Sequence, residues 1–120
     1  MGNSELSKQL NELGLETYSP ALGFVTFKYT VPHGRFKDKE IEIALNAPKF
    51  PIVPPSGIYV KPFIMSISGG GGVHPNGGIH DSKQPTAEFQ YWSRPFREWG
   101  NSEKSAKEYL AFIRTLFDFE

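Results

Sequence analysis

The residues whose side chains could do chemistry gather in one stretch, residues 69–101. This stretch holds both tryptophans, two of the three histidines (His74 and His80), three prolines, and six glycines before residue 79. Regular hydrophobic periodicity is missing from it. Loops longer than about fifteen residues are uncommon in compact domains and are often functional. We therefore expect a functional site within this stretch.

Some kinds of site do not fit the residue types. The chain has no cysteine, which excludes disulfides and thiolate metal sites. The glycine run at 69–72 lacks the Lys-Ser/Thr that would follow in a phosphate-binding loop. We expect no metal and no cofactor, because no common zinc site has the spacing of His33, His74, His80 and Asp81.

Length and composition narrow the class of protein. The 120 residues are enough for one domain, 1–120, with a single core. Thirteen basic residues balance thirteen acidic ones, so a general affinity for nucleic acid is not expected. The sequence shows neither an apolar run near twenty residues nor a signal-peptide pattern at its start. We expect a cytoplasmic protein that binds neither nucleic acid nor membrane.

The elements that must position this stretch can be read from the periodicity. Residues 4–13 repeat leucines at helical spacing, with Asn3 or Ser4 as cap and Gly14 as terminator. Residues 23–31 and 40–45 alternate apolar and polar side chains and predict two strands. A third strand is expected at 57–63, and 64–68 extends or follows it. The short connections favour an antiparallel meander.

A final amphipathic helix closes the predicted order. We expect Ser102 to cap it, and its apolar stripe consists of Ala106, Tyr109, Leu110, Ile113, Leu116 and Phe117. The whole chain therefore reads as an α+β domain: a helix, a meander of about four strands, a long ordered loop and a helix.

Three motifs in this order resemble a known family. The proline stretch Pro48-Lys49-Phe50-Pro51-Ile52-Val53-Pro54-Pro55 lies between the second and third predicted strands. His74-Pro75-Asn76 comes about twenty residues later, and Trp92-Ser93-Arg94-Pro95 leads towards the last helix. The chain resembles the ubiquitin-conjugating (UBC-like) enzymes, whose fold has this order with a crossing C-terminal helix. It departs from the family pattern by one missing residue after Pro48 and by Phe50 in place of tyrosine.

The resemblance implies a group-transfer reaction. Family members accept the C-terminal glycine of a ubiquitin-like modifier as a thioester on cysteine and pass it to an amine. Asn76 would then donate a hydrogen bond to the oxyanion of the transition state, and His74 would brace the loop. Trp92, Ser93, Arg94, Phe50 and Pro54 are also candidates for partner contacts. The alternative for Trp92 and Trp99 is packing in the core or the loop, and for Arg94 a stacked or salt-bridged side chain.

The position of the missing cysteine stays open between two registers. One places His80 in the cysteine slot, within Gly77-Gly78-Ile79-His80. The other places it at Ala87, because Cys→Ala silences such an enzyme with little change in shape. A third interpretation is a chain that naturally lacks the cysteine. Ser82 or Ser93 could form an oxyester only beside an activating base, and no such pairing can be read from the sequence.

Two functions follow from these alternatives. The first is a conjugating-type transferase of a bacterial branch, which Trp92-Ser93-Arg94 with Trp99 favours. Relatives of that branch are encoded beside a ubiquitin-like modifier, an activating enzyme and a deconjugating metallopeptidase, so these are the expected partners. The setting implied is a bacterial conjugation operon, with antiphage defence as one possible role. The second function is a cysteine-free adaptor of the same fold, which binds a ubiquitin-like protein without chemistry.

Overall fold

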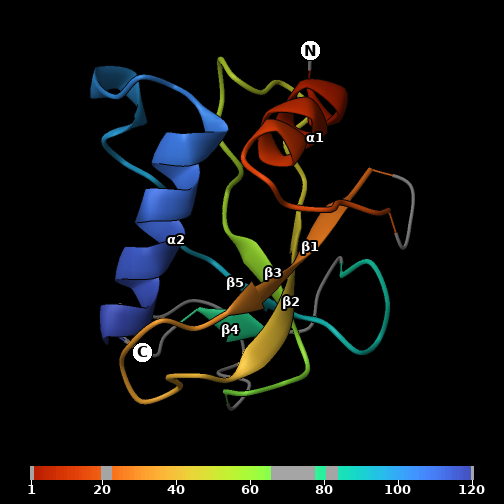
Figure 1. The fold of residues 1–120 in the computed structure, drawn as a ribbon, viewed down its shortest axis with the longest axis vertical. Coiled ribbons are helices and arrows are strands. Elements are labelled where there is room, and N and C mark those ends of the chain that lie inside the picture. The colour runs from red at the N-terminus through yellow and green to blue at the C-terminus, as the bar shows by residue number, and fades with distance from the viewer. Residues whose placement is uncertain (1, 20–22, 66–77, 81–83, 120) are drawn as a thin grey trace.

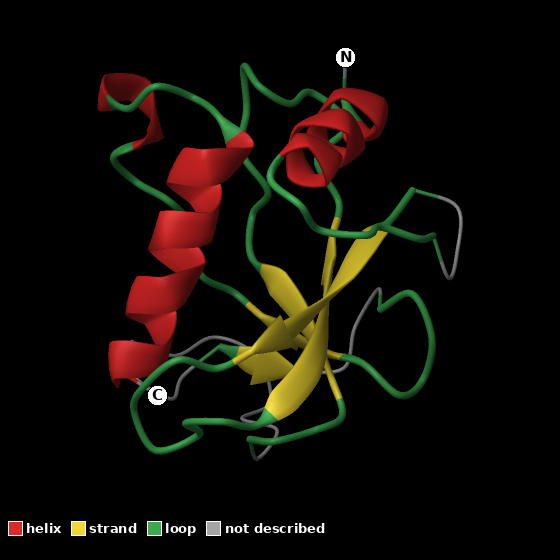
Figure 2. Ribbon diagram, viewed as in Figure 1, coloured by secondary structure: helices red, strands yellow, loops and turns green. Residues whose placement is uncertain are grey.

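The described part of the computed structural model comprises residues 2–19, 23–65, 78–80 and 84–119. Its regular structure consists chiefly of two helices and an antiparallel sheet, which confirms the α+β class (Figures 1 and 2). The elements in chain order are α1 (Asn3–Glu12), β1 (Val25–Thr30), β2 (Glu40–Leu45), β3 (Ile58–Lys61), β4 (Ile79–His80), β5 (Gln90–Trp92), the 3₁₀ helix η1 (Trp99–Asn101) and α2 (Ala106–Phe119).

The three predicted strands form the expected meander. β1 pairs with β2 from Val25 opposite Leu45 to Thr30 opposite Glu40, and β2 pairs with β3 in turn. The described residues form a five-stranded sheet in the order β1-β2-β3-β5-β4. β5 therefore lies beside β3, and the earlier strand β4 takes the edge. This arrangement brings a late part of the chain back to the centre of the sheet.

The structure corrects two local predictions and decides between the alternatives of a third. Residues 69–101 are not wholly irregular, because β4 and β5 lie among the residues described there. Residues 64 and 65 do not extend β3. α1 begins at Asn3 after Gly2 and has no side-chain cap, so neither Asn3 nor Ser4 caps it. The prediction for the other end is confirmed, because Gly14, with a φ of 92°, follows the end of α1.

The start of the last helix is also corrected. α2 begins at Ala106, and its cap is Ser105, whose Oγ accepts the backbone N–H of Glu108 at 3.2 Å. Ser102, which follows η1, instead donates to the carbonyl of Trp99, the first residue of that helix. Lys104 has a φ of 54°, which is incompatible with a helix running from 102 to 106.

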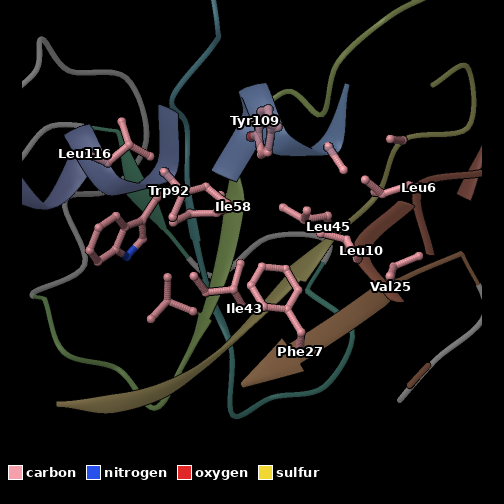
Figure 3. Packing of buried hydrophobic residues seen from close by; sticks show 14 of the residues in the cluster. Leu6, Leu10, Val25, Phe27, Ile43, Leu45, Ile58, Trp92, Tyr109 and Leu116 are labelled. Atoms are coloured by element: carbon pink, nitrogen blue, oxygen red, sulfur yellow. The ribbon is translucent and has the colours of Figure 1, made fainter. Parts of the chain in front are cut away.

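Both helices pack on one face of the sheet. Figure 3 shows Leu6 and Leu10 of α1 and Tyr109 and Leu116 of α2 in one cluster with strand residues, among them Phe27. Alternate residues of each strand reach this core, and fully burying one such side chain stabilises the fold by about 1.5–3 kcal/mol. The opposite face carries a second, smaller cluster of Phe24, Ala44, Tyr59, Phe89 and Tyr91. Within the described residues, no helix is long and apolar enough to cross a membrane.

The proline stretch packs into the core. Phe50 is fully buried, and its ring centroid lies 5.8 Å from that of Trp99. The indole N–H of Trp99 donates to the carbonyl oxygen of Pro51 at 2.9 Å. The connection between β2 and β3 therefore packs against η1, which lies just before α2 in the chain.

Candidate functional site

The predicted site residues divide into those the structure describes and those it does not. His74 and Asn76 lie outside the described residues. His80 is in β4, where its backbone is opposite Tyr91 of β5; its side chain lies outside the described part. Ala87 is described fully and lies in the connection between β4 and β5.

Ala87 projects from a turn whose backbone is fixed. The Phe89 N–H donates to the carbonyl of Thr86 at 3.2 Å, and the Glu88 N–H donates to the Thr86 hydroxyl at 3.3 Å. The methyl group of Ala87 is exposed. A larger side chain at this position would therefore project into solvent without displacing neighbours.

An ion pair ties this turn to the sheet. Nζ of Lys61, at the end of β3, lies 3.2 Å from Oε2 of Glu88 and 3.6 Å from Oε2 of Glu42. The hydrogen bond with Glu88, followed by the attraction of Glu42, raises the pKa of Lys61 above its usual value. Lys61 therefore stays charged at neutral pH and links the Ala87 turn to two central strands.

The aromatic residues predicted at partner contacts lie in the core. Trp92 and Phe50 are both fully buried, and the Trp92 ring packs 5.4 Å from that of Phe117. In this conformation they offer no surface to a partner. Ser93 is exposed and Pro54 is half-buried, so a partner would meet these two residues instead.

Arg94 lies at an unexpected depth. Its side chain is only 3% exposed, and its Nη1 donates to the carbonyl of Ser93 at 2.9 Å. A Cβ added to Gly78 would lie 3.5 Å from the same Nη1 atom. Arg94 therefore packs beside the start of β4 rather than on the molecular surface.

Gln90, a buried polar side chain in β5, was missed in the prediction from sequence. Gln90 is fully buried in β5, and its amide makes hydrogen bonds with the backbone of residues 64 and 65 and with the Trp92 indole. A lone glutamine between two aromatic residues was the signal that could have identified it.

The described part of the site offers an exposed, backbone-fixed position at Ala87, a strand position at His80 and the buried, hydrogen-bonded side chain of Gln90 in β5. In the ranges that the structure describes, no three His, Cys, Asp or Glu side chains gather closely enough to hold a metal ion. The chain matches no known protein-family model, and searches of curated proteins and of solved structures find no match.

Proposed function

We propose that this protein is a ubiquitin-conjugating-like transferase, of the type that carries a ubiquitin-like modifier as a thioester and passes it to an amine. The proposal concerns a form bearing a cysteine at position 87 or 80. A ubiquitin-like modifier and its activating enzyme are the partners, and a deconjugating metallopeptidase is expected to act on the product.

The placement of Ala87 is the observation that supports this proposal most directly. An acyl-carrying thiol must be reached by two large proteins in turn, so it needs an exposed position on a defined backbone. Ala87 has both properties, since its side chain is exposed and Thr86 fixes its turn. The order of the motifs around it, with His74-Pro75-Asn76 before β4 and Trp92-Ser93-Arg94 after it, agrees with the same proposal.

The proposed chemistry proceeds in two acyl transfers. The thiolate first attacks the thioester that joins the modifier to the activating enzyme, and the enzyme's thiol leaves. An amine then attacks the new thioester carbon, the C–S bond breaks, and the amine proton passes to solvent. Negative charge develops on the carbonyl oxygen in the second step, where the amide N–H of Asn76 would donate to it.

The test restores a cysteine and looks for the thioester. Ala87→Cys and His80→Cys are each incubated with modifier, activating enzyme and ATP, and the product is resolved with and without reductant. Ala111→Cys is the matched control, since Ala111 is exposed on α2. We expect a reductant-sensitive adduct with Ala87→Cys or His80→Cys and none with Ala111→Cys. The transferase proposal is wrong if neither site forms the adduct.

The alternative is an adaptor of the same fold, favoured by the absence of cysteine from all 120 residues. This alternative predicts that the chain binds a ubiquitin-like protein without forming any covalent intermediate. Calorimetric titration of the unaltered chain with the modifier separates the two functions, because an adaptor binds the modifier without ATP or activating enzyme. A native coding sequence containing the cysteine would exclude the adaptor.

A further inference from the structure

The Ala87 turn, residues 86–88, has one polar link to the sheet among the residues that the structure describes. That link is the ion pair between Oε2 of Glu88 and Nζ of Lys61, at 3.2 Å. The other hydrogen bonds of the turn join Phe89 and Glu88 back to Thr86 and so lie within it. Beyond the turn, burial fixes the chain, because Phe89 is only 1% exposed and packs in the smaller cluster of the sheet.

Lys61 is itself held from the side of β2. Its backbone is opposite Glu42 in the register of β2 with β3, and its Nζ lies 3.6 Å from Oε2 of that glutamate. The other carboxylate oxygen of Glu42 accepts the hydroxyl of Tyr18. Nζ of Lys61 also lies 5.9 Å from the ring centroid of Phe89, within the range of a cation–π contact. The ammonium group therefore has a defined place between β2 and the Ala87 turn.

The charge of Glu88 bears on the chemistry because Glu88 directly follows position 87. A carboxylate beside a thiol disfavours the thiolate, whereas a nearby ammonium favours it. The thiolate is the form that attacks in the first acyl transfer. Without its ion pair, Glu88 would therefore release the turn and oppose the ionisation of a thiol at position 87. The ammonium group of Lys61 counters both effects.

We propose that Lys61 is a positioning residue for the transfer reaction and acts through Glu88: it holds the Ala87 turn against β3 and offsets the negative charge beside the reacting thiol. This inference rests on the proposed function, with the cysteine at position 87. The side chain of Lys61 is 32% exposed and that of Glu88 is 68% exposed. An ion pair with this exposure changes an equilibrium by at most about fivefold, and we expect effects of that size.

The test is a double-mutant cycle in the Ala87→Cys version. Lys61→Met removes the ammonium group, Glu88→Gln removes the carboxylate, and a third variant carries both substitutions. The readout is the rate at which the thiol reacts with dipyridyl disulfide, a neutral reagent, over a range of pH around the usual thiol pKa of about 8.5. The thiolate attacks one sulfur of the reagent, and the other sulfur leaves as pyridinethione. This reaction needs neither modifier nor activating enzyme.

For Lys61→Met we expect a raised thiol pKa and a rate at neutral pH that is lower by about twofold to fivefold. Lys61→Arg keeps the charge and should restore most of the rate. In the Glu88→Gln background, Lys61→Met should have a clearly smaller effect, because the carboxylate that it leaves unpaired is no longer there. Equal effects in the two backgrounds would overturn the proposal.

Lys28→Met is the matched control. Lys28 is exposed on β1 and belongs to no ion pair among the described residues, so this substitution should leave the thiol pKa and the rate unchanged. A loss of rate equal to that of Lys61→Met would mean that any nearby positive charge has the effect, and would overturn the proposal.

The same variants are then compared in thioester formation with modifier, activating enzyme and ATP, where Lys61→Met should again be slower by about twofold to fivefold. A thioester that forms on His80→Cys and not on Ala87→Cys would overturn the role of Lys61 and leave the transferase function standing. If neither version forms a thioester, the transferase function fails by itself. The disulfide reaction then decides separately whether Lys61 and Glu88 act together on position 87.

Discussion

Gly57 directly precedes β3 and lies against the backbone at the end of β5, so a side chain added at Gly57 should separate β3 from β5. A Cβ on Gly57 would lie 2.1 Å from the carbonyl oxygen of Trp92 and 3.0 Å from the amide nitrogen of Arg94. Both neighbours are backbone atoms, so neither can rotate away. Gly57→Ala therefore requires the start of β3 to move by about 1 Å, a case of overpacking.

The loss in free energy of unfolding expected for Gly57→Ala can be worked out from this contact. Overpacking of a well-packed region typically costs about 1–3 kcal/mol, and contact with rigid backbone favours the upper half of that range. At about 2.1 cal/mol/K of unfolding entropy per residue, a chain of 120 residues has an unfolding entropy of about 0.25 kcal/mol/K. A loss of about 2 kcal/mol then lowers Tm by about 8 °C.

Gly100 provides the matched control. A Cβ at Gly100, in η1, meets no heavy atom within 4 Å, so the same substitution should be neutral or stabilise by about 0.4–1 kcal/mol through the unfolded state. Urea and thermal unfolding followed by far-UV circular dichroism give the free energy of unfolding of each glycine variant relative to the parent. A Gly57→Ala variant within about 0.5 kcal/mol of the parent would refute the packing argument, as would equal losses at both glycines.

Three further outcomes are expected. Gln9→Met removes the side-chain acceptor of the Ala106 N–H at the start of α2. The free energy of unfolding in urea titrations should therefore fall by about 1 kcal/mol. No loss would mean that water replaces Gln9 as the acceptor of this N–H. Burial raises the pKa of Tyr109 above its usual 10.0, so its contribution to stability is full below pH 10.0 and is lost as the pH rises. Unfolding experiments above pH 10 should therefore show a fall of about 1.4 kcal/mol per pH unit that Tyr109→Phe removes, and equal slopes in both proteins would contradict this. In a thioester-forming version, Asn76→Ala should slow discharge by about 10²–10³-fold while Asn101→Ala leaves it unchanged, and equal rates would exclude an oxyanion role.

The parts of the fold that the sequence predicted correctly are those where one periodicity dominates. In β2, Ile41, Ile43 and Leu45 recur at every second position, with Glu40 and Glu42 between the first of them, and its observed bounds match the prediction. β5 has no such alternation, because Gln90 faces the main core and Tyr91 belongs to the smaller cluster on the other face. Polar Gln90 and apolar Trp92 share its core face and aromatic Tyr91 lies on the other, so no apolar–polar alternation marks this strand.

The start of α2 was predictable, but from a different signal. Ser102 and Ser105 both suit a cap, yet only Ser105 has a glutamate three residues later, as in a capping box. The position of Arg94 was not predictable, because nothing in the order Trp92-Ser93-Arg94 indicates that the serine is exposed while the arginine is buried. Such placements depend on contacts distant in the chain, which local patterns do not encode.

The two buried indoles give the molecule a pair of built-in optical probes. The Trp92 N–H donates to Gln90 in the sheet, whereas the Trp99 N–H donates to Pro51 in the proline stretch. Single-tryptophan versions, with phenylalanine at the other position, would each emit from one of these two environments. Their emission during unfolding would show whether the sheet centre and the proline stretch open together or in sequence.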